Sequence, residues 1–232
     1  MRGRWLLPGL LIVSACFPGP ARAQTPASPR LPKTPVRGPD VVVRIYNYAG
    51  APADELAAAE AQAVRLLEEA GVATEWRICP DPTKAAELPV ECKSTGLPRE
   101  FWVNLLPRKM TKGIQVSPHT FGLTLHDPTG RTGQVSWVFY ARVREAAKEG
   151  PATVPQLLGH AFAHELGHLL FGNTEHSPEG LMRACWGEKE IRLVAAGKLG
   201  FDAADSRHLR LALFQQKEAP AGEIAAVGLH SP

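Results

Sequence analysis

The pattern of apolar and polar positions predicts a strand, a helix and a second strand near the start of the folded part. Residues 41–48 are rich in β-branched and aromatic side chains, which favours a strand. Apolar side chains recur at helical spacing over 53–70, and Gly71 can cap that helix at its end. Residues 72–78 have the composition of another strand. Because the joints are short, we expect a βαβ unit with two parallel, neighbouring strands.

Further strands and two later helices are predicted downstream. Apolar positions at helical spacing over 154–171 predict a helix with Leu158 and Phe162 near one face. Asp202, with Asp205 three positions later, resembles a capping arrangement before a last helix over about 203–216. The remaining strand candidates, separated by proline and glycine, are 101–106, 114–117, 121–125 and 134–143. The predicted fold class is α/β (α+β), a mixed twisted sheet with a βαβ unit and a small C-terminal helical part.

Residues 1–23 have the three-part pattern of a secretory signal peptide. Arg2 and Arg4 precede an apolar run over 5–17, and small residues at Ala21 and Ala23 offer cleavage after Ala23. The run is shorter than the ~20 residues that a membrane span requires. We therefore expect a secreted or periplasmic, cell-envelope protein with no transmembrane span after processing.

An alternative interpretation of this region involves Cys16. The sequence over 13–16 resembles a bacterial lipobox, in which Cys16 would carry a lipid anchor. Beyond the signal peptide, repeated prolines over 24–39 predict an extended Pro-rich linker. We assign 40–216 to one folded domain and expect 217–232 to be a disordered tail.

The positive charge of the chain belongs to the signal peptide. Cleavage after Ala23 removes three of the 26 basic residues and none of the 23 acidic ones, which leaves the mature chain formally neutral. A neutral chain has no electrostatic reason to bind nucleic acid. We therefore expect no nucleic-acid partner.

The cysteines of the mature chain predict one disulfide. An oxidising compartment permits a bond, and Cys79 and Cys92 are the natural pair because they flank one Pro-rich loop. Cys185 is then left over, and we expect it to be a small buried apolar residue.

The candidate chemistry lies in His164-Glu165-Leu166-Gly167-His168, an HExxH motif. Positions i and i+4 lie one turn apart on one face of a helix, so both imidazoles can reach one metal ion. A zinc ion with three protein ligands keeps a position for water and lowers the pKa of that water to ~7. Glu165 lies beside the metal, where it can act as the base. His160 is two turns from His168, too far for the same ion, so we expect it to be packed or to support a ligand.

The residues after this helix continue the pattern. Gly172 can end the helix and reverse the chain toward His176, and Met182 follows in a Gly-Leu-Met turn. This series resembles the metzincin metallopeptidases, which combine HExxH, a helix-ending glycine, a third histidine and a methionine turn. The resemblance covers about 40–216 in layout and 164–182 in motif.

The resemblance implies a zincin-like fold in which the helix over 154–171 is the active-site helix. It implies Glu165 as the catalytic base and Met182 as a hydrophobic floor. It also implies that the strand over 121–125 forms the upper rim of a cleft and pairs with extended peptide. The implied metal ligands for Zn²⁺ are His164, His168 and His176.

The spacing of the third ligand departs from the family pattern. Gly172 follows His168, and His176 follows Gly172, with one residue more in each gap than the metzincin pattern has. The alternative third ligands are Glu175, or Glu188 and Glu190 from a downstream helix. No tyrosine stands just beyond Met182, so a phenolic transition-state donor cannot be assigned.

These features predict an exported zinc-dependent peptidase, a hydrolase whose partner is a peptide or protein substrate. One alternative is a zinc amidase acting on a non-protein amide, because the site specifies only a polarised carbonyl. Another is a non-catalytic zinc-binding envelope protein. Glu165 argues against this last alternative, since a purely structural site needs a fourth protein ligand rather than a base.

Overall fold

The computed structural model describes residues 39–95, 99–114, 117, 120–126 and 132–218. The description concerns the unit Gly38–Pro232. The predicted signal peptide, nearly all of the predicted linker and the tail from 219 onward lie outside the described residues. None of the helices in the described ranges has the length and apolar character that crossing a membrane requires.

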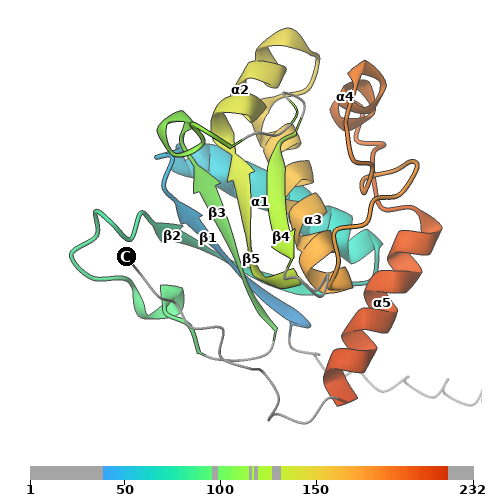
Figure 1. The fold of residues 1–232 in the computed structure, drawn as a ribbon, viewed down its shortest axis with the longest axis horizontal. Helices are drawn as coiled ribbons and strands as arrows, with labels where there is room; N and C mark the ends of the chain where they lie inside the picture. Colours follow the sequence, from blue (N-terminus) through green and yellow to red (C-terminus); the bar gives the residue numbers. More distant parts are fainter. Residues whose placement is uncertain (1–38, 96–98, 115–116, 118–119, 127–131, 219–232) are drawn as a thin grey trace, which may run out of the picture. The chain divides into compact units, whose positions relative to one another are not determined.

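A five-stranded sheet forms the centre of the domain (Figure 1). Its strands are β1 (Val41–Asn47), β2 (Thr74–Pro80), β3 (Glu100–Leu106), β4 (Gly122–His126) and β5 (Thr132–Phe139), in the order β2-β1-β3-β5-β4. β1 is parallel to β2 and β3, β3 is parallel to β5, and β4 is antiparallel to β5 at the edge. The sheet is therefore mixed, and the predicted βαβ unit with parallel neighbouring strands is confirmed.

Five α-helices accompany the sheet: α1 (Ala53–Glu69), α2 (Tyr140–Glu149), α3 (Val154–Phe171), α4 (Glu188–Ala195) and α5 (Ala203–Glu218). Two short 3₁₀ turns, η1 (Val90–Cys92) and η2 (Arg108–Met110), lie in the connections. α1 and α3 pack side by side behind the sheet in Figure 1. α3 also contacts α2, α4, α5 and the strands β3, β4 and β5, so it occupies the middle of the domain.

The central position of α3 explains its composition. Every residue from Leu157 to Leu170 is buried, so the helix must be apolar all round rather than on one face. At its start, Thr153 and Gln156 form a reciprocal capping box, and at its end Gly172 adopts a left-handed φ of 72°. Both ends of the helix are thereby held in place, which fixes the side chains that it carries.

Three sequence-based predictions about local structure were wrong. The strand expected over 134–143 ends at Phe139, because Ala, Arg, Glu and Lys after that point favour the helix α2. Ile114 and Ser117, at the ends of the strand expected over 114–117, are not in a strand, and the two residues between them lie outside the described residues. Cys185 is exposed rather than buried, because the neighbouring Trp186 takes the buried position in this loop.

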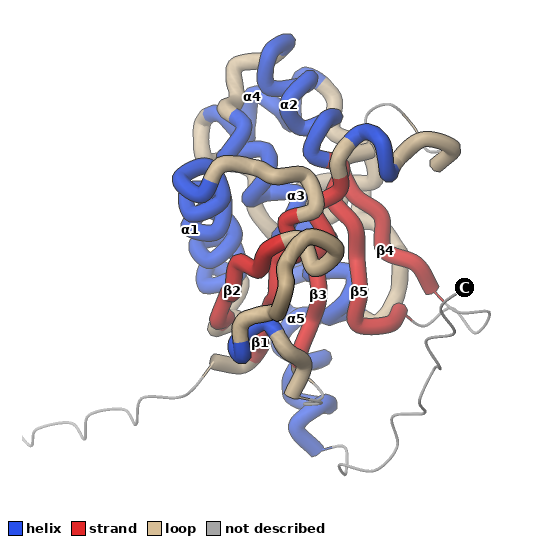
Figure 2. The backbone as a smooth tube through the Cα atoms, turned by 90° about the vertical axis from the view of Figure 1, so that its left-hand side faces the viewer, coloured by secondary structure: helices blue, strands red, loops and turns tan. Residues whose placement is uncertain are grey.

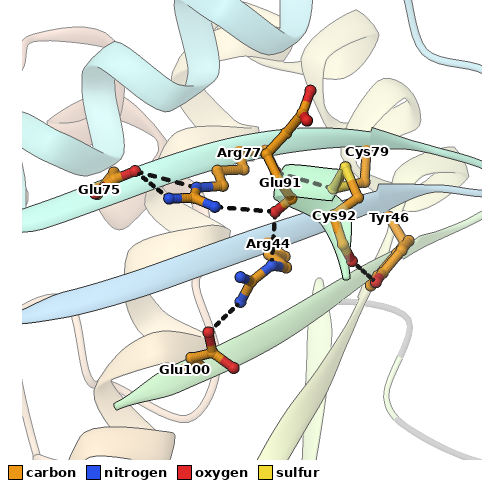
Figure 3. The surroundings of a disulfide bond; sticks show 8 residues. All are labelled: Arg44, Tyr46, Glu75, Arg77, Cys79, Glu91, Cys92 and Glu100. Atoms are coloured by element: carbon orange, nitrogen blue, oxygen red, sulfur yellow. Dashed lines mark hydrogen bonds and ion pairs between the residues drawn. A yellow bond between two sulfur atoms is a disulfide. The ribbon is translucent and has the colours of Figure 1, made fainter. Parts of the chain in front are cut away.

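The face of the sheet away from the helices is covered locally by a disulfide-closed loop (Figures 2 and 3). Side chains alternate along β1, so Val43 and Ile45 join the core while Arg44 and Tyr46 point to the other face. The loop between β2 and β3 passes over these two residues, and its disulfide joins Cys79 to Cys92 with Cα atoms 5.7 Å apart. We call this region the disulfide face.

A buried ion pair lies under that loop. Arg44 Nη1 is 3.0 Å from Glu100 Oε1, and Arg44 Nε donates to the Glu91 carbonyl at 2.9 Å. Glu100 Oε2 also accepts hydrogen bonds from Ser94 Oγ and from the Thr95 backbone N–H. Each of these buried charges therefore has a charged partner and further hydrogen bonds.

Candidate metal centre

Helix α3 brings His164 and His168 together at the surface of a cleft. The two residues lie one helical turn apart, and their Nε2 atoms are 3.1 Å from each other. The rings are nearly perpendicular, with centroids 4.7 Å apart. Two nitrogens bound to one tetrahedral zinc at 2.0–2.1 Å would be about 3.3 Å apart. The observed spacing therefore fits two ligands of one ion.

A backbone carbonyl orients His164 for this role. His164 Nδ1 lies 2.8 Å from the Leu181 oxygen, which can only accept, so Nδ1 carries the proton. The lone pair is then on Nε2, which faces His168. Trp186 Nε1 donates to the same Leu181 oxygen at 3.2 Å, and its ring stands edge-on to that of His164. Leu181 thus fixes both the tautomer and the surroundings of the first ligand.

His176 completes a group of three imidazoles. Gly172 reverses the chain, and the His176 ring centroid lies 5.5 Å from that of His164 and 4.7 Å from that of His168. One ligand atom from each ring lies within 4.8 Å of the others, and in the described part of the chain no other three potential ligands meet this condition. These three histidines can bind a metal ion. His176 is exposed, whereas the two helix histidines are buried.

The alternative third ligands have other partners or lie outside this group. Glu190 accepts hydrogen bonds from Arg183 Nη1 at 2.6 Å and from the Gly187 backbone N–H at 2.9 Å. Glu188 pairs with Arg192 on the exposed side of α4. Glu175 is exposed, and it does not belong to the group of three in the described residues.

The turn after the third histidine packs directly under α3. Met182 is fully buried, and a Cβ placed on Gly167 would lie 2.7 Å from its sulfur. Only glycine leaves that space for Met182 against the helical turn that carries both histidines. Ser177 joins the loop to this turn, because its backbone N–H donates to the Met182 carbonyl at 3.0 Å. The loop with His176 and the turn with Met182 thus support each other.

The edge strand β4 holds Glu165. Thr124 Oγ1 donates to Glu165 Oε2 at 2.7 Å. A Cβ on Gly122 would lie 2.3 Å from Glu165 Oε1, so the carboxyl group rests against the bare backbone of that glycine. Sequence reasoning missed both contacts. Thr124 is 41 positions from Glu165, and nothing in the local sequence indicates such a pair.

Burial governs the electrostatics of the centre. It raises the pKa of Glu165 to about 8, against the opposing hydrogen bond from Thr124. It lowers the pKa of His164 to about 4, and the hydrogen bond to Leu181 only partly opposes this. Burial, aided by the rings of His164 and His176, lowers the pKa of His168 to about 2. The two helix histidines are therefore neutral near pH 7, which is the form that binds a metal.

His160 lies outside the metal group, two turns back along α3. It is buried, and its ring nitrogens lie 2.7 Å from the Gln156 carbonyl and 3.2 Å from the Leu199 carbonyl. Its ring stands edge-on to Trp186. The prediction of a packed histidine at this position is confirmed.

The three histidines and Glu165 open onto a cavity of about 330 Å³. One wall consists of six consecutive residues, Thr120 to Leu125. Because strand side chains alternate between faces, a consecutive run means that the edge of β4 faces the cavity. The lining also contains Arg183, Ala184 and Trp186, which follow the methionine turn. Trp186 and Phe121 pack against each other across one end, with centroids 5.7 Å apart.

Comparisons with known proteins do not identify this arrangement. No protein-family model matches the chain, and no curated protein matches it either. The functional interpretation therefore depends on the geometry of the centre and on the sequence motif.

Proposed function

We propose that this protein is an exported zinc-dependent peptidase of the hydrolase class. The observation that supports this most directly is the combination in one cavity of three metal-competent imidazoles and a buried carboxyl beside them. Export is supported by the signal-peptide pattern over 1–23.

The donor set favours zinc. Three neutral imidazoles without thiolate or hard oxygen ligands suit zinc better than calcium or magnesium. His164 and His168 would hold the ion with Nε2, and His176 would supply the third nitrogen. With three protein ligands, zinc keeps a coordination position for water, which is typical of catalytic rather than structural sites. When bound, zinc would supply Lewis acidity, which acidifies a water ligand and polarises a substrate carbonyl.

Glu165 would move the protons of the reaction. In the metal-free protein burial raises its pKa to about 8, and a zinc ion beside it would lower that pKa, so that the carboxylate can accept a proton near neutral pH. Thr124 and Gly122 set its position from the side of β4. The residue can therefore take a proton from the attacking water and deliver it to the leaving amine.

The edge strand favours a peptide over a small amide as the substrate. β4 is the last strand of the sheet, and its residues from Gly122 to Leu125 line the cavity. An extended peptide can pair with such an edge through backbone hydrogen bonds, while a small amide would leave those groups unused.

We also infer a zincin-like fold of the metzincin type. The features that support it are the antiparallel edge strand, the helix ending at Gly172, the third histidine and the turn with the buried Met182. In the gap between Gly172 and His176, Asn173 Oδ1 accepts from the Glu175 backbone N–H at 3.0 Å, which forms a local turn in this loop.

The test compares the mature chain from Gln24 with its Glu165→Gln variant. We expect both to bind about one zinc ion, and the variant to lose about 10²–10⁴-fold of its turnover on a peptide library, because only the base is removed. Glu175→Gln is the matched control, since this exposed glutamate lies in the neighbouring loop. Equal turnover in Glu165→Gln would refute the base. Hydrolysis of non-peptide amides only would indicate an amidase, and zinc binding without any turnover a non-catalytic protein.

A further inference from the structure

The cavity has one permanent positive charge that the proposed reaction does not use. Apart from the three histidines and Glu165, its lining consists of apolar residues, threonines and Arg183. Arg183 directly follows the buried Met182, so its backbone position is tied to the floor of the metal centre. Because Arg183 lines the cavity, its charge is available to a ligand that binds there.

Glu190 forms an ion pair with Arg183 but leaves the Arg183 side chain partly exposed. Arg183 Nη1 lies 2.6 Å from Glu190 Oε1, and the other oxygen of Glu190 accepts from the Gly187 backbone N–H at 2.9 Å. The Arg183 side chain is 45% exposed, whereas that of Glu190 is 6% exposed. The carboxylate is therefore below the surface, and the guanidinium is the part of this pair that a ligand meets.

The guanidinium has donors left for a ligand. It carries five N–H groups in a planar fork, and the pair with Glu190 engages Nη1. The remaining edge can bind a carboxylate through two parallel hydrogen bonds. The neighbouring Ala184 and Trp186 lower the local polarity, which strengthens such a contact relative to water.

We propose that Arg183 selects substrates with a carboxylate next to the bond that is cleaved. This inference rests on the proposed peptidase function, because it concerns the same cavity. The carboxylate can belong to an aspartate or glutamate side chain or to the free C-terminus of the peptide, and the chemistry of recognition is the same for both.

The kinetic experiment uses the zinc-loaded mature chain and two series of matched peptide pairs. One series compares Glu with Gln at each position around the cleaved bond, and the other compares a free C-terminal carboxylate with a C-terminal amide. We expect at least about tenfold higher kcat/KM for the carboxylate member of one series. A side-chain preference identifies an acidic residue, and a terminal preference identifies the free C-terminus.

Arg183→Gln should reduce this preference to about one, with zinc content unchanged. Arg65→Gln is the matched control: it loses the same charge from an exposed pair with Glu69 on α1, and it should keep the preference. If Arg183→Gln fails to bind zinc, Arg183→Lys replaces it. Lysine retains the charge but not the planar fork, so the preference should fall at least about threefold. An equal loss of kcat/KM for all peptides, or an unchanged preference, would overturn the inference.

A binding measurement separates this inference from the proposed function. In the Glu165→Gln background, calorimetry gives the dissociation constants of the same carboxylate and neutral peptides without any hydrolysis. A preference of about tenfold that disappears with Arg183→Gln supports the inference even if no peptide is ever cleaved. Equal dissociation constants, or no binding of either peptide, would overturn it.

Discussion

On the disulfide face of the sheet, Arg44 and Glu100 are almost completely buried and lie 3.0 Å apart. In the candidate metal centre, His164, Glu165 and His168 are nearly as deeply buried, but the Nε2 atoms of the two histidines face each other at 3.1 Å. The first region pairs every buried charge with an opposite charge or a hydrogen-bond donor. In the second, Glu165 accepts one hydrogen bond from Thr124, and among the described residues no ion pair with an arginine or lysine compensates for its burial.

The two buried glutamates express this difference in their pKa values. Burial would raise the pKa of Glu100, but hydrogen bonds from Thr95 and the Arg44 guanidinium outweigh it and hold that pKa below its ordinary value. Burial raises the pKa of Glu165 to about 8, and one hydrogen bond from Thr124 cannot compensate. A carboxyl stabilised as an anion contributes to the fold, while a carboxyl with a pKa near neutrality is suited to proton transfer.

The largest effect is expected from removing a metal ligand. His168→Ala should abolish stoichiometric zinc binding and lower peptide turnover at least about 10³-fold, because the ion loses one of three ligands. His160→Gln on the same helix is the control and should keep the zinc. Metal analysis of the purified variants, followed by peptide digestion, checks both results. Zinc retained by His168→Ala would contradict the assignment of this ligand.

The same metal analysis settles the third ligand. We expect His176→Ala to lose zinc, and Glu188→Gln and Glu190→Gln to retain it, because both glutamates have arginine partners. Retention by His176→Ala together with loss in either glutamate variant would move the third ligand to α4.

Next in size is the buried ion pair of the disulfide face. Glu100→Gln should lower the free energy of unfolding by about 4 kcal/mol, because it leaves the Arg44 charge buried and unpaired. The control is Glu75→Gln, which breaks the more exposed pair with Arg77 on β2 and should cost less than about 1 kcal/mol. Urea unfolding measures both. Similar losses of unfolding free energy in the two variants would show that burial does not increase the contribution of the Arg44–Glu100 pair.

The disulfide should contribute slightly less. The double variant Cys79→Ser, Cys92→Ser opens a loop with a sequence separation of 13 residues, which should lower the free energy of unfolding by about 3 kcal/mol. Cys185→Ser changes only an exposed free thiol and should have little effect. Because the disulfide face is separate from the cleft, the double variant should still bind zinc at temperatures where it is folded. Loss of zinc from the folded variant would show that the two regions are coupled.

The stability of the metal-free protein should depend on pH because burial raises the pKa of Glu165. Between the ordinary pKa of 4.5 and the folded-state pKa of about 8, Glu165 binds more protons in the folded than in the unfolded chain. The metal-free protein should therefore lose stability through this group as the pH rises over that range. The helix histidines have lowered pKa values and act in the opposite direction below about pH 6.5.

Comparing the wild-type protein with the Glu165→Gln variant isolates the contribution of Glu165 to the pH dependence of stability. Between pH 5.5 and pH 7, the wild-type protein should lose about 2 kcal/mol relative to Glu165→Gln, both measured without metal by urea unfolding. Parallel curves for the two proteins would mean that the pKa of this carboxyl is not raised in the folded state.

The smallest effect concerns the strand that supports Glu165. Thr124→Val removes the hydrogen bond to the carboxylate, which should lower kcat/KM about tenfold. Since that bond lowers the pKa of Glu165, the acidic limb of the pH–activity profile should move to higher pH. Thr120→Val, in the same wall of the cavity, is the control. A uniform loss at every pH would indicate that Thr124 acts on packing rather than on the base.

Much of the fold could be predicted where one segment carries its own signal. The βαβ unit followed from β-branched runs and a helical repeat that ends at Gly71, and helix α3 followed from its apolar spacing. The boundary between β5 and α2 could not be predicted so well. Val138 to Tyr140 continues the composition of a strand, yet α2 begins at Tyr140, whose hydroxyl donates to Glu55 Oε1 of α1 at 2.6 Å.

The sequence by itself determined that two histidines and a glutamate share one helical turn, because a spacing of four residues becomes a shared face in any α-helix. Tertiary structure alone decided the rest of the centre. The Leu181 carbonyl orients His164, Gly122 and Thr124 hold Glu165, and Glu190 pairs with Arg183 in the wall of the cavity. These contacts join residues from separate elements, and burial rather than residue type moves the pKa values. Neither the contacts between elements nor the burial of a side chain can be predicted from the local sequence.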